Sequence, residues 1–374
     1  MNTTNNSTNS TTAMEEVGHV TVNSLFPILF QTTSQYNVVL YKYLIPFLSV
    51  LEIFCGVLTI VIFWKTKLGN PTHMFLLGIC VCDTMSSLSI GSISAYVFYF
   101  EDYRDYLPFR ICKLYTYLYV FFPVFCHYTS SYLTVGLAIQ RYICVVYPFV
   151  ARRICSKKRT LFYILFSILC SSAYFAFQIH SHSYHVMETS SFYVTNLTVS
   201  ACSIVVSNFA LCYIHPILFI VLPLIILICI QPAMLRSLRR SQETMKTVPI
   251  SGAHNAARTL SVITLWVVFT FVLCELPTLI YMCGTFVCLE FNLCSLLFSQ
   301  PWVVFTNFTI LILIVAPLFN FVIYIVYNRL FRQTLRDIFT SCRRTTKKKH
   351  LEPECFKCET NVTLLRISQS TSSS

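Results

Sequence analysis

Apolar residues run along this chain in seven long stretches separated by polar connections. Each stretch is close to, or longer than, the roughly 20 residues with which a helix crosses about 30 Å of hydrocarbon. The stretches lie near 42–64, 74–99, 113–140, 160–179, 213–235, 259–283 and 300–327. Several contain a proline, which predicts kinks of the kind tolerated inside a membrane bundle. These prolines are Pro123, Pro223, Pro277 and Pro317. The pattern predicts an all-α membrane protein, a seven-transmembrane helix bundle.

The composition supports this interpretation. Hydrophobic residues make up 55% of the chain and charged residues only 11%, with a mean hydropathy of +0.65. A soluble domain has too little interior to bury so much apolar surface. The net charge of +12 would fit a nucleic-acid partner, but the basic residues gather in particular loops rather than along one face. We therefore expect the lipid bilayer, and no nucleic acid, as a partner.

The basic residues also predict orientation. Lys and Arg are absent from 1–40, 181–212 and 284–299, and they recur in the alternate connections and after the last stretch. Because Lys and Arg concentrate in cytoplasmic loops, the N-terminus is expected outside and the protein is expected to be a multi-pass plasma-membrane protein. Only the connection 101–112 mixes both signs of charge and stays ambiguous.

Three regions follow from this topology. Residues 1–41 are expected to be an extracellular glycosylated segment, 42–341 the seven-helix domain, and 342–374 a disordered cytoplasmic tail that offers serines for phosphorylation and arrestin docking. Five asparagines outside the predicted spans begin glycosylation triplets on the predicted outer side. They are Asn2, Asn5, Asn6, Asn9 and Asn196.

Topology alone admits a receptor, a transporter or a membrane enzyme, so ionisable residues within the spans must decide. Asp83 falls about midway through the second stretch, and Arg141 ends the third. An arginine at the bilayer centre costs about 2.5 to 3.5 kcal/mol, so it is kept where it is used or lies near the interface. The structural alternatives are a polar group satisfied by neighbouring helices for Asp83 and a side chain extending to the interface for Arg141.

The sequence Gln140-Arg141-Tyr142 resembles the Asp-Arg-Tyr motif of rhodopsin-like (class A) G-protein-coupled receptors. The residues around Asp83 resemble the second-helix pattern of the same family. The resemblance implies that Arg141 turns toward a heterotrimeric G protein on activation, and that Asp83 belongs to a network with water and a sodium ion. Gln140 stands where the family has an acid, so the ionic restraint of the inactive state is expected to be weak.

The last stretch carries a second resemblance. Asn320-Phe321-Val-Ile-Tyr324 resembles the seventh-helix Asn-Pro-x-x-Tyr motif, with Phe321 in place of proline. Beyond it, 329–341 places apolar residues on one face and basic residues on the other, which predicts a short amphipathic helix along the inner membrane surface. Cys342 follows directly and is placed for palmitoylation, although a cysteine would occur there by chance almost as often.

A third resemblance lies in the sixth stretch. Phe271, Cys274 and Pro277 match the family's Phe-x-x-Cys-x-x-Pro pattern, and Glu275 stands where most members have tryptophan. This substitution places a carboxylate near the floor of the expected ligand cavity. A role in ligand binding or in a polar network is favoured over a purely structural one.

The family also has a disulfide between the third helix and the second outer loop. Cys112 and Cys202 are the matching residues, so the resemblance implies that they pair. The chain holds 18 cysteines, and Cys212 is a rival partner for Cys112.

Within the family, the Asn320-Phe321 ending and the arrangement of Pro123 and His127 ahead of a Leu-Thr-Val sequence resemble invertebrate FMRFamide and related neuropeptide receptors. This implies a short amidated peptide as the extracellular ligand. An arginine of such a peptide needs a carboxylate, for which Glu275 is the inner candidate, and its aromatic ring needs an apolar wall. The expected wall residues are Tyr115, Tyr119, Phe122 and Tyr281.

Two alternatives stay open at this stage. A chemosensory receptor for a small molecule is compatible with the divergent sixth helix. A transporter is more remote, because no internal repeat is visible. No motif for catalysis, for a metal site or for a cofactor other than the sodium ion is present, so the chain is not expected to be an enzyme.

Overall fold

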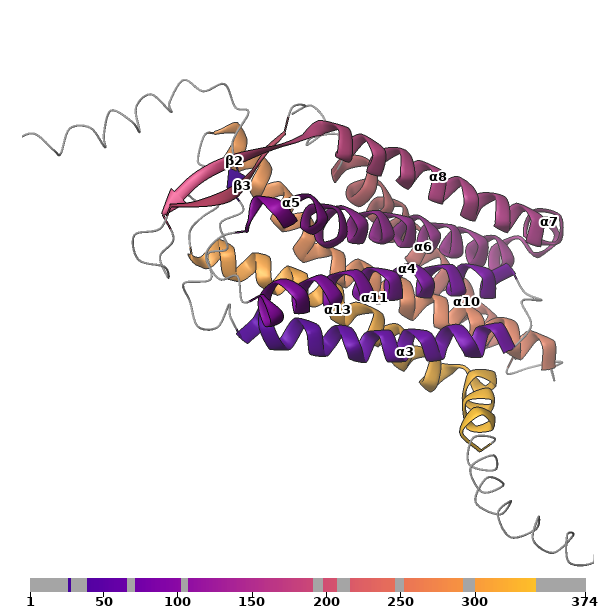
Figure 1. Ribbon diagram of the computed structural model, residues 1–374. Helices are drawn as coiled ribbons and strands as arrows, with labels where there is room; N and C mark the ends of the chain where they lie inside the picture. The colour runs from indigo at the N-terminus through magenta and orange to yellow at the C-terminus, as the bar shows by residue number, and fades with distance from the viewer. Residues whose placement is uncertain are drawn as a thin grey trace, which may run out of the picture.

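A computed structural model describes residues 26–27, 39–65, 71–101, 107–190, 198–206, 216–245, 252–291 and 300–340. Seven of its helices are long and apolar enough to cross a membrane, which confirms the predicted bundle. The spans are Leu40–Lys65, Pro71–Phe100, Phe109–Val146, Lys157–Ser181, Ile217–Arg239, Arg258–Gly284 and Val304–Tyr327. They lie side by side in one elongated bundle (Figure 1).

The spans are built from α-helices, and four of the described spans also contain a short π-helical turn. The α-helices are α3 (Ile45–Lys65), α4 (Pro71–Ser94), α5 (Phe109–Tyr115), α6 (Phe122–Val146), α7 (Pro148–Ile154), α8 (Lys157–Ser181), α10 (Leu222–Met245), α11 (Gly252–Glu290) and α13 (Gln300–Tyr327). The π-helical turns are η2 (Leu40–Leu44), η3 (Ala95–Phe100), η4 (Thr116–Phe121) and η5 (Ile217–Val221). Short α7 lies between α6 and α8 in the chain, at one end of the bundle (Figure 1).

Three π-helical turns end two residues before a proline. Pro46 follows η2, Pro123 follows η4 and Pro223 follows η5 at the same spacing. A proline cannot donate a backbone hydrogen bond and its ring crowds the carbonyl four residues earlier. The wider turn moves the bonding back by one residue, as when the Phe122 amide donates to the Tyr117 carbonyl. The helix therefore passes each proline without breaking.

Small residues bring the first helices close together. A Cβ atom on Gly56 of α3 would collide with the Thr84 hydroxyl of α4, and one on Gly91 of α4 would meet Ser49 of α3. Gly136 of α6 is enclosed in the same way by the rings of Phe75 and Tyr163. Close backbone approach through Gly, Ser and Thr is how helices associate in lipid, where apolar area alone gives no driving force.

An antiparallel sheet covers one end of the bundle, and the sequence pattern did not predict it. Strands β2 (His182–Ser190) and β3 (Thr198–Val206) form a hairpin, and β1 (Phe26–Pro27) pairs with the outer side of β3. We call this the sheet end, and the opposite end, which carries α7, the α7 end (Figure 1). The expected outer connection 181–212 is thus partly strand rather than loop.

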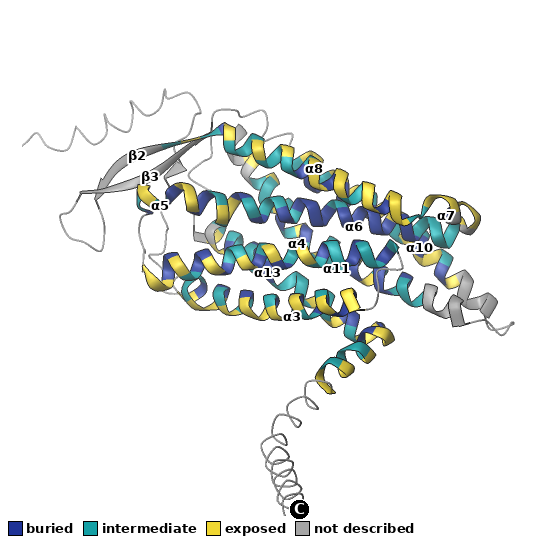
Figure 2. Cartoon of the chain, turned by 45° about the vertical axis from the view of Figure 1, so that its right-hand side comes forward, coloured by how far each residue is buried: buried dark blue, intermediate teal, exposed yellow. Residues whose placement is uncertain are grey.

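A further helix follows α13 at 329–340 and leaves the bundle at the α7 end (Figure 1). Asn328 begins it, because its side chain accepts a hydrogen bond from the Phe331 amide at 3.1 Å. Phe331 is buried against Phe63 and Tyr324, whereas Leu330 and Phe339 are exposed. Buried residues gather on the inner faces of the spans and exposed apolar residues on the outer faces (Figure 2). This is the distribution expected of helices that face lipid.

Candidate functional site

Asp83 of α4 lies at the junction of three cavities inside the bundle. The Ser130 hydroxyl of α6 donates a hydrogen bond to Asp83 Oδ1 at 2.9 Å. A carboxylate in the middle of a span is costly unless neighbouring groups satisfy it, and it therefore marks functional sites. The predicted role of Asp83 in an activation network stays a prediction.

One of these cavities, of about 200 Å³, lies between Asp83 and the sheet end. Its wall is mostly apolar and comes from α4, α6, α11, α13 and η5; it includes Ile90, Val124, Ile220, Tyr281, Met282 and Ile310. Its floor holds Asp83 and His127. Among the described residues that line it, none is Lys or Arg. An apolar pocket with a few convergent polar groups at its base is the usual form of a ligand site.

His127 and Glu275 close the floor of this cavity. His127 Nε2 of α6 lies 2.6 Å from Glu275 Oε1 of α11, and the Glu275 side chain is only 3% exposed. The ring of Phe271 stacks on His127 at 6.4 Å. Below the pair, a smaller cavity of about 50 Å³ is lined by Asp83, Ser130, Cys274 and Asn320, among others. The His127–Glu275 pair therefore separates an outer cavity from an inner one.

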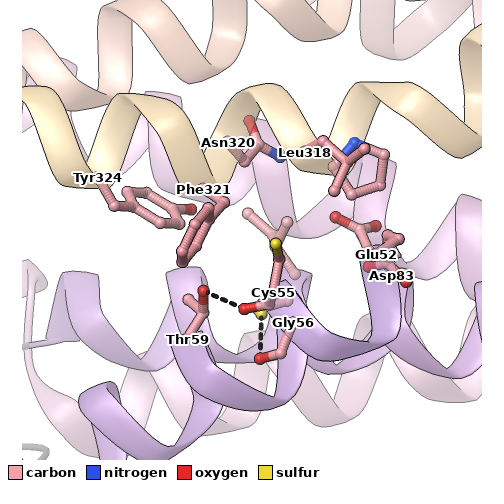
Figure 3. A pocket seen from close by; sticks show the side chains of 12 residues that line it. Glu52, Cys55, Gly56, Thr59, Asp83, Leu318, Asn320, Phe321 and Tyr324 are labelled. Carbon is pink, nitrogen blue, oxygen red and sulfur yellow. Dashed lines mark hydrogen bonds between the residues drawn. The ribbon is translucent and has the colours of Figure 1, made fainter. Parts of the chain in front are cut away.

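The third cavity, of about 20 Å³, lies between α3, α4 and α13 (Figure 3). Glu52 of α3 and Asp83 point into it from one side, and Asn320 and Tyr324 face it from α13 (Figure 3). Glu52 is 2% exposed, Ser87 lies within hydrogen-bonding reach of its carboxyl, and its Oε2 atom has no partner among the described residues. A space of this size holds about one water molecule.

The sodium ion implied by the family resemblance can be tested against these side chains. Hard cations prefer oxygen ligands. Asp83, Ser130 and Asn320 supply a carboxylate, a hydroxyl and an amide oxygen around the inner cavity. The donor set fits such an ion, which would neutralise buried negative charge when bound. The ion itself stays a prediction.

Arg141 lies at the α7 end of α6 and is only 5% exposed. Its Nη2 atom donates a hydrogen bond to the hydroxyl of Thr72, the second residue of α4. Thr72 in turn donates to Gln140 Oε1 at 3.3 Å. The Thr72 hydroxyl of α4 thus bridges Arg141 and Gln140, which are adjacent in α6. An acid in place of Gln140 would have bonded the arginine directly. Tyr142 packs edge-on against Tyr147 at the start of α7.

The cysteine predicted to begin the third span is oxidised. Cys112 of α5 is disulfide-bonded. Strand β3, which carries Cys202, packs against α5, so the predicted partner belongs to the adjacent element. The pairing of Cys112 with Cys202 stays a prediction.

The five residues expected at the ligand cavity are distributed unequally. Tyr281 lines the outer cavity and stacks on Trp302. Glu275 lies beneath it in the inner cavity. Tyr115 and Tyr119 stack on each other in a buried cluster nearer the sheet, and Phe122 contacts Phe125. Of these, the structure brings only Tyr281 to the outer cavity wall.

The family model named 7 transmembrane receptor (rhodopsin family) matches residues 55–324 of the chain. The chain belongs to this receptor family. The match includes Asp83, Arg141, Glu275 and Tyr324, which the resemblance had singled out. It excludes the transporter alternative, and members of the family are receptors rather than enzymes.

Curated relatives of this receptor are named after the sex peptide receptor or after FMRFamide. It is 26% identical to the sex peptide receptor of Drosophila melanogaster over 82% of the chain and 73% of that protein. It is 23% identical to sex peptide receptor-related protein 2 of Caenorhabditis elegans over 81% of the chain and 72% of that protein. A shorter match, 26% identical over 35% of the chain and 24% of the relative, is to the Drosophila melanogaster FMRFamide receptor. The resemblance to neuropeptide-type class A receptors is confirmed.

Besides Ser130, three polar residues of the receptor core were not among the predicted site residues. Glu52, His127 and Thr72 contact or adjoin Asp83, Glu275 and Arg141 respectively. Glu52 and His127 are ionisable groups within spans, so the reasoning applied to Asp83 would have found them. Thr72 carried no such signal. The predicted modification sites Asn2, Asn5, Asn6, Asn9, Asn196 and Cys342 lie outside the described residues.

Proposed function

We propose that the receptor binds a short amidated peptide from outside the cell and activates a heterotrimeric G protein inside it. The observation that carries this proposal is the apolar cavity of about 200 Å³ with the Asp83 carboxylate and the His127–Glu275 pair at its base. A cationic side chain entering the cavity would meet the Asp83 carboxylate, and the described lining holds no basic residue other than His127.

The size of the cavity supports a peptide that inserts only its end. Pockets that enclose drug-sized ligands measure about 300 to 1,000 Å³. The cavity is smaller, so the remainder of a peptide would lie above it, toward β2 and β3. The names of the relatives, sex peptide receptor and FMRFamide receptor, favour the same ligand class over a small chemosensory molecule.

The opposite end supports coupling to a G protein. Arg141 donates there to the uncharged hydroxyl of Thr72, and the described residues give it no ion-pair partner. A neutral partner is released at a lower energetic cost than a carboxylate. The orientation with the sheet end outside, in the plasma membrane, and the docking of arrestin on a phosphorylated tail belong to this proposal.

A panel of amidated peptides, each with its free-acid form, tests the proposal in cells that express the full chain. We expect a second-messenger response to at least one amidated peptide, a weaker response to its free acid, and no response from Arg141→Ala at equal surface expression. Activation by small odorants with no response to any peptide would contradict the peptide assignment. A peptide response that Arg141→Ala leaves unchanged would contradict the coupling role.

A further inference from the structure

Two cysteines face each other at the α7 end. Cys144 lies in the last turn of α6, and Cys155 lies in the two-residue connection between α7 and α8. Both are free and partly buried. Their sulfur atoms are 3.8 Å apart, and the Cys155 sulfur is 3.9 Å from the Gln140 carbonyl oxygen. The fold therefore brings together two thiols on either side of α7.

Backbone hydrogen bonds fix the chain between these two cysteines. The amides of Tyr147, Ala151 and Cys155 donate in succession to the carbonyls of Ile143, Tyr147 and Ala151 at 2.8 to 2.9 Å. A disulfide has its sulfurs about 2.05 Å apart. The two sulfur atoms must still approach each other, and rotation of one side chain supplies a movement of that order. A bond would therefore form with α7 in its present place.

We propose that Cys144 and Cys155 are an oxidation site, at which a peroxide converts the two thiols into a reversible disulfide that fixes α7 against α6. One thiol loses its proton, the thiolate attacks a peroxide oxygen, and the O–O bond breaks to give a sulfenic acid and hydroxide, which takes up that proton to form one water. The second thiol attacks the sulfenic sulfur, the S–O bond breaks, and a second water leaves with the thiol proton. Two sulfurs are oxidised and one peroxide is reduced. A dithiol reductant restores both thiols by exchange.

The position of the pair indicates what the bond would do. Cys144 follows Arg141 by one helical turn, and Cys155 lies against the Gln140 carbonyl. In this arrangement Arg141 is bonded to Thr72. A bond that fixes α7 here would favour the arrangement in which Arg141 is held. Burial, followed by the neighbouring Cys144, raises the pKa of the Cys155 thiol to about 11. Little thiolate is present near neutral pH, so the site would respond to sustained peroxide rather than to traces.

Mass spectrometry of the full chain in membranes tests the chemistry without needing a ligand. Membranes are treated with hydrogen peroxide, free thiols are blocked with N-ethylmaleimide, and the protein is digested. We expect a cross-linked peptide pair containing Cys144 and Cys155, which is lost after dithiothreitol and absent from Cys144→Ser and from Cys155→Ser. Cys229→Ser, which removes an exposed cysteine of α10, is the matched control and should still give the cross-link.

A second measurement separates a bond in the folded receptor from one formed during unfolding. Tryptic cleavage after Arg153 of α7 in solubilised receptor should slow several-fold on oxidation in the wild type and in Cys229→Ser, and stay unchanged in Cys155→Ser. Sulfinic acid at either cysteine without a cross-link would overturn the proposal. So would a cross-link that forms only in heat-denatured samples. Neither result depends on the ligand or on G-protein coupling.

Discussion

The His127–Glu275 pair gives a prediction that can be worked out from the structure. Two unit charges at the observed 2.6 Å attract each other by about 6 kcal/mol at an effective dielectric constant of about 20. Removing both charges from water offsets most of this attraction. A hydrogen bond to a charged group retains about 1.5 to 3 kcal/mol. We therefore expect a coupling energy of about 2 kcal/mol between the two side chains, which is roughly 30-fold in an equilibrium constant.

A double-mutant cycle measures this coupling. The variants are Glu275→Gln, His127→Gln and the two combined, and the measurement is the thermal unfolding midpoint of the receptor purified in detergent. Each single change removes one charge and leaves the other uncompensated in the interior, which should cost about 3 to 5 kcal/mol. The double variant should lose less than the sum of the two, by about the coupling energy. Thr264→Val removes a buried hydroxyl of α11 that bonds only its own helix, and it serves as the control with a small effect.

Additive losses in the double variant would refute the reasoning. In that case the short distance between Nε2 and Oε1 contributes no net energy, and the boundary between the outer and inner cavities must be maintained by packing. A loss in Thr264→Val as large as that in Glu275→Gln would show instead that any buried polar change in α11 is equally harmful.

Three other changes have defined outcomes. Gln140→Glu exchanges a neutral acceptor for a charged one beside Arg141. If the interaction that restrains Arg141 gains about 1 kcal/mol, ligand-independent second-messenger production should fall by about fivefold. Equal basal signals in both proteins would argue against this restraint of Arg141. Burial lowers the pKa of His182 below 6.5, and its hydrogen bond to the Gln178 carbonyl partly opposes this shift. The folded state therefore binds fewer protons than the unfolded state and should lose thermal stability below about pH 6.5. His182→Gln should remove this acid sensitivity, and an unchanged pH profile would exclude His182 as its source. Gly136→Val would push against the rings of Phe75 and Tyr163, so it should cost about 1 to 3 kcal/mol and lower the unfolding midpoint, whereas a wild-type midpoint would mean that α8 can move away.

The seven helices could be predicted from the sequence because each apolar stretch specifies its own length and burial. The sheet could not be predicted, because the segment 181–212 shows neither a strict alternation of apolar and polar residues nor a turn motif that would indicate the pairing of β2 with β3. Asp83, Arg141 and Glu275 were found because an ionisable group in a span is costly and therefore informative. Their partners Thr72 and Ser130 were not, because hydroxyls are common in such helices and only three-dimensional proximity distinguishes them.

The expected cavity wall illustrates a second limit. In a regular helix side chains recur every 3.6 residues, and Tyr115 of α5 and Tyr119 of η4 precede the part of this span, α6, that lines the outer cavity. The π-helical turn η4 inserts one additional residue into that period. Residues on the two sides of the turn are then rotated by about 100° relative to the regular pattern. Helical periodicity read from the sequence cannot identify a cavity-facing residue across such a turn.

The spacing between these turns and their prolines has an evolutionary consequence. Because η2, η4 and η5 each hold one residue more than the regular helix needs, a single-codon deletion there is a plausible mutational step for the fold. Such a deletion would substitute no residue at the sheet end and yet rotate one helix end, presenting a different set of side chains to the cavity. Receptors of this architecture therefore have a route to new ligand preferences through changes in chain length, without any substitution at the binding surface.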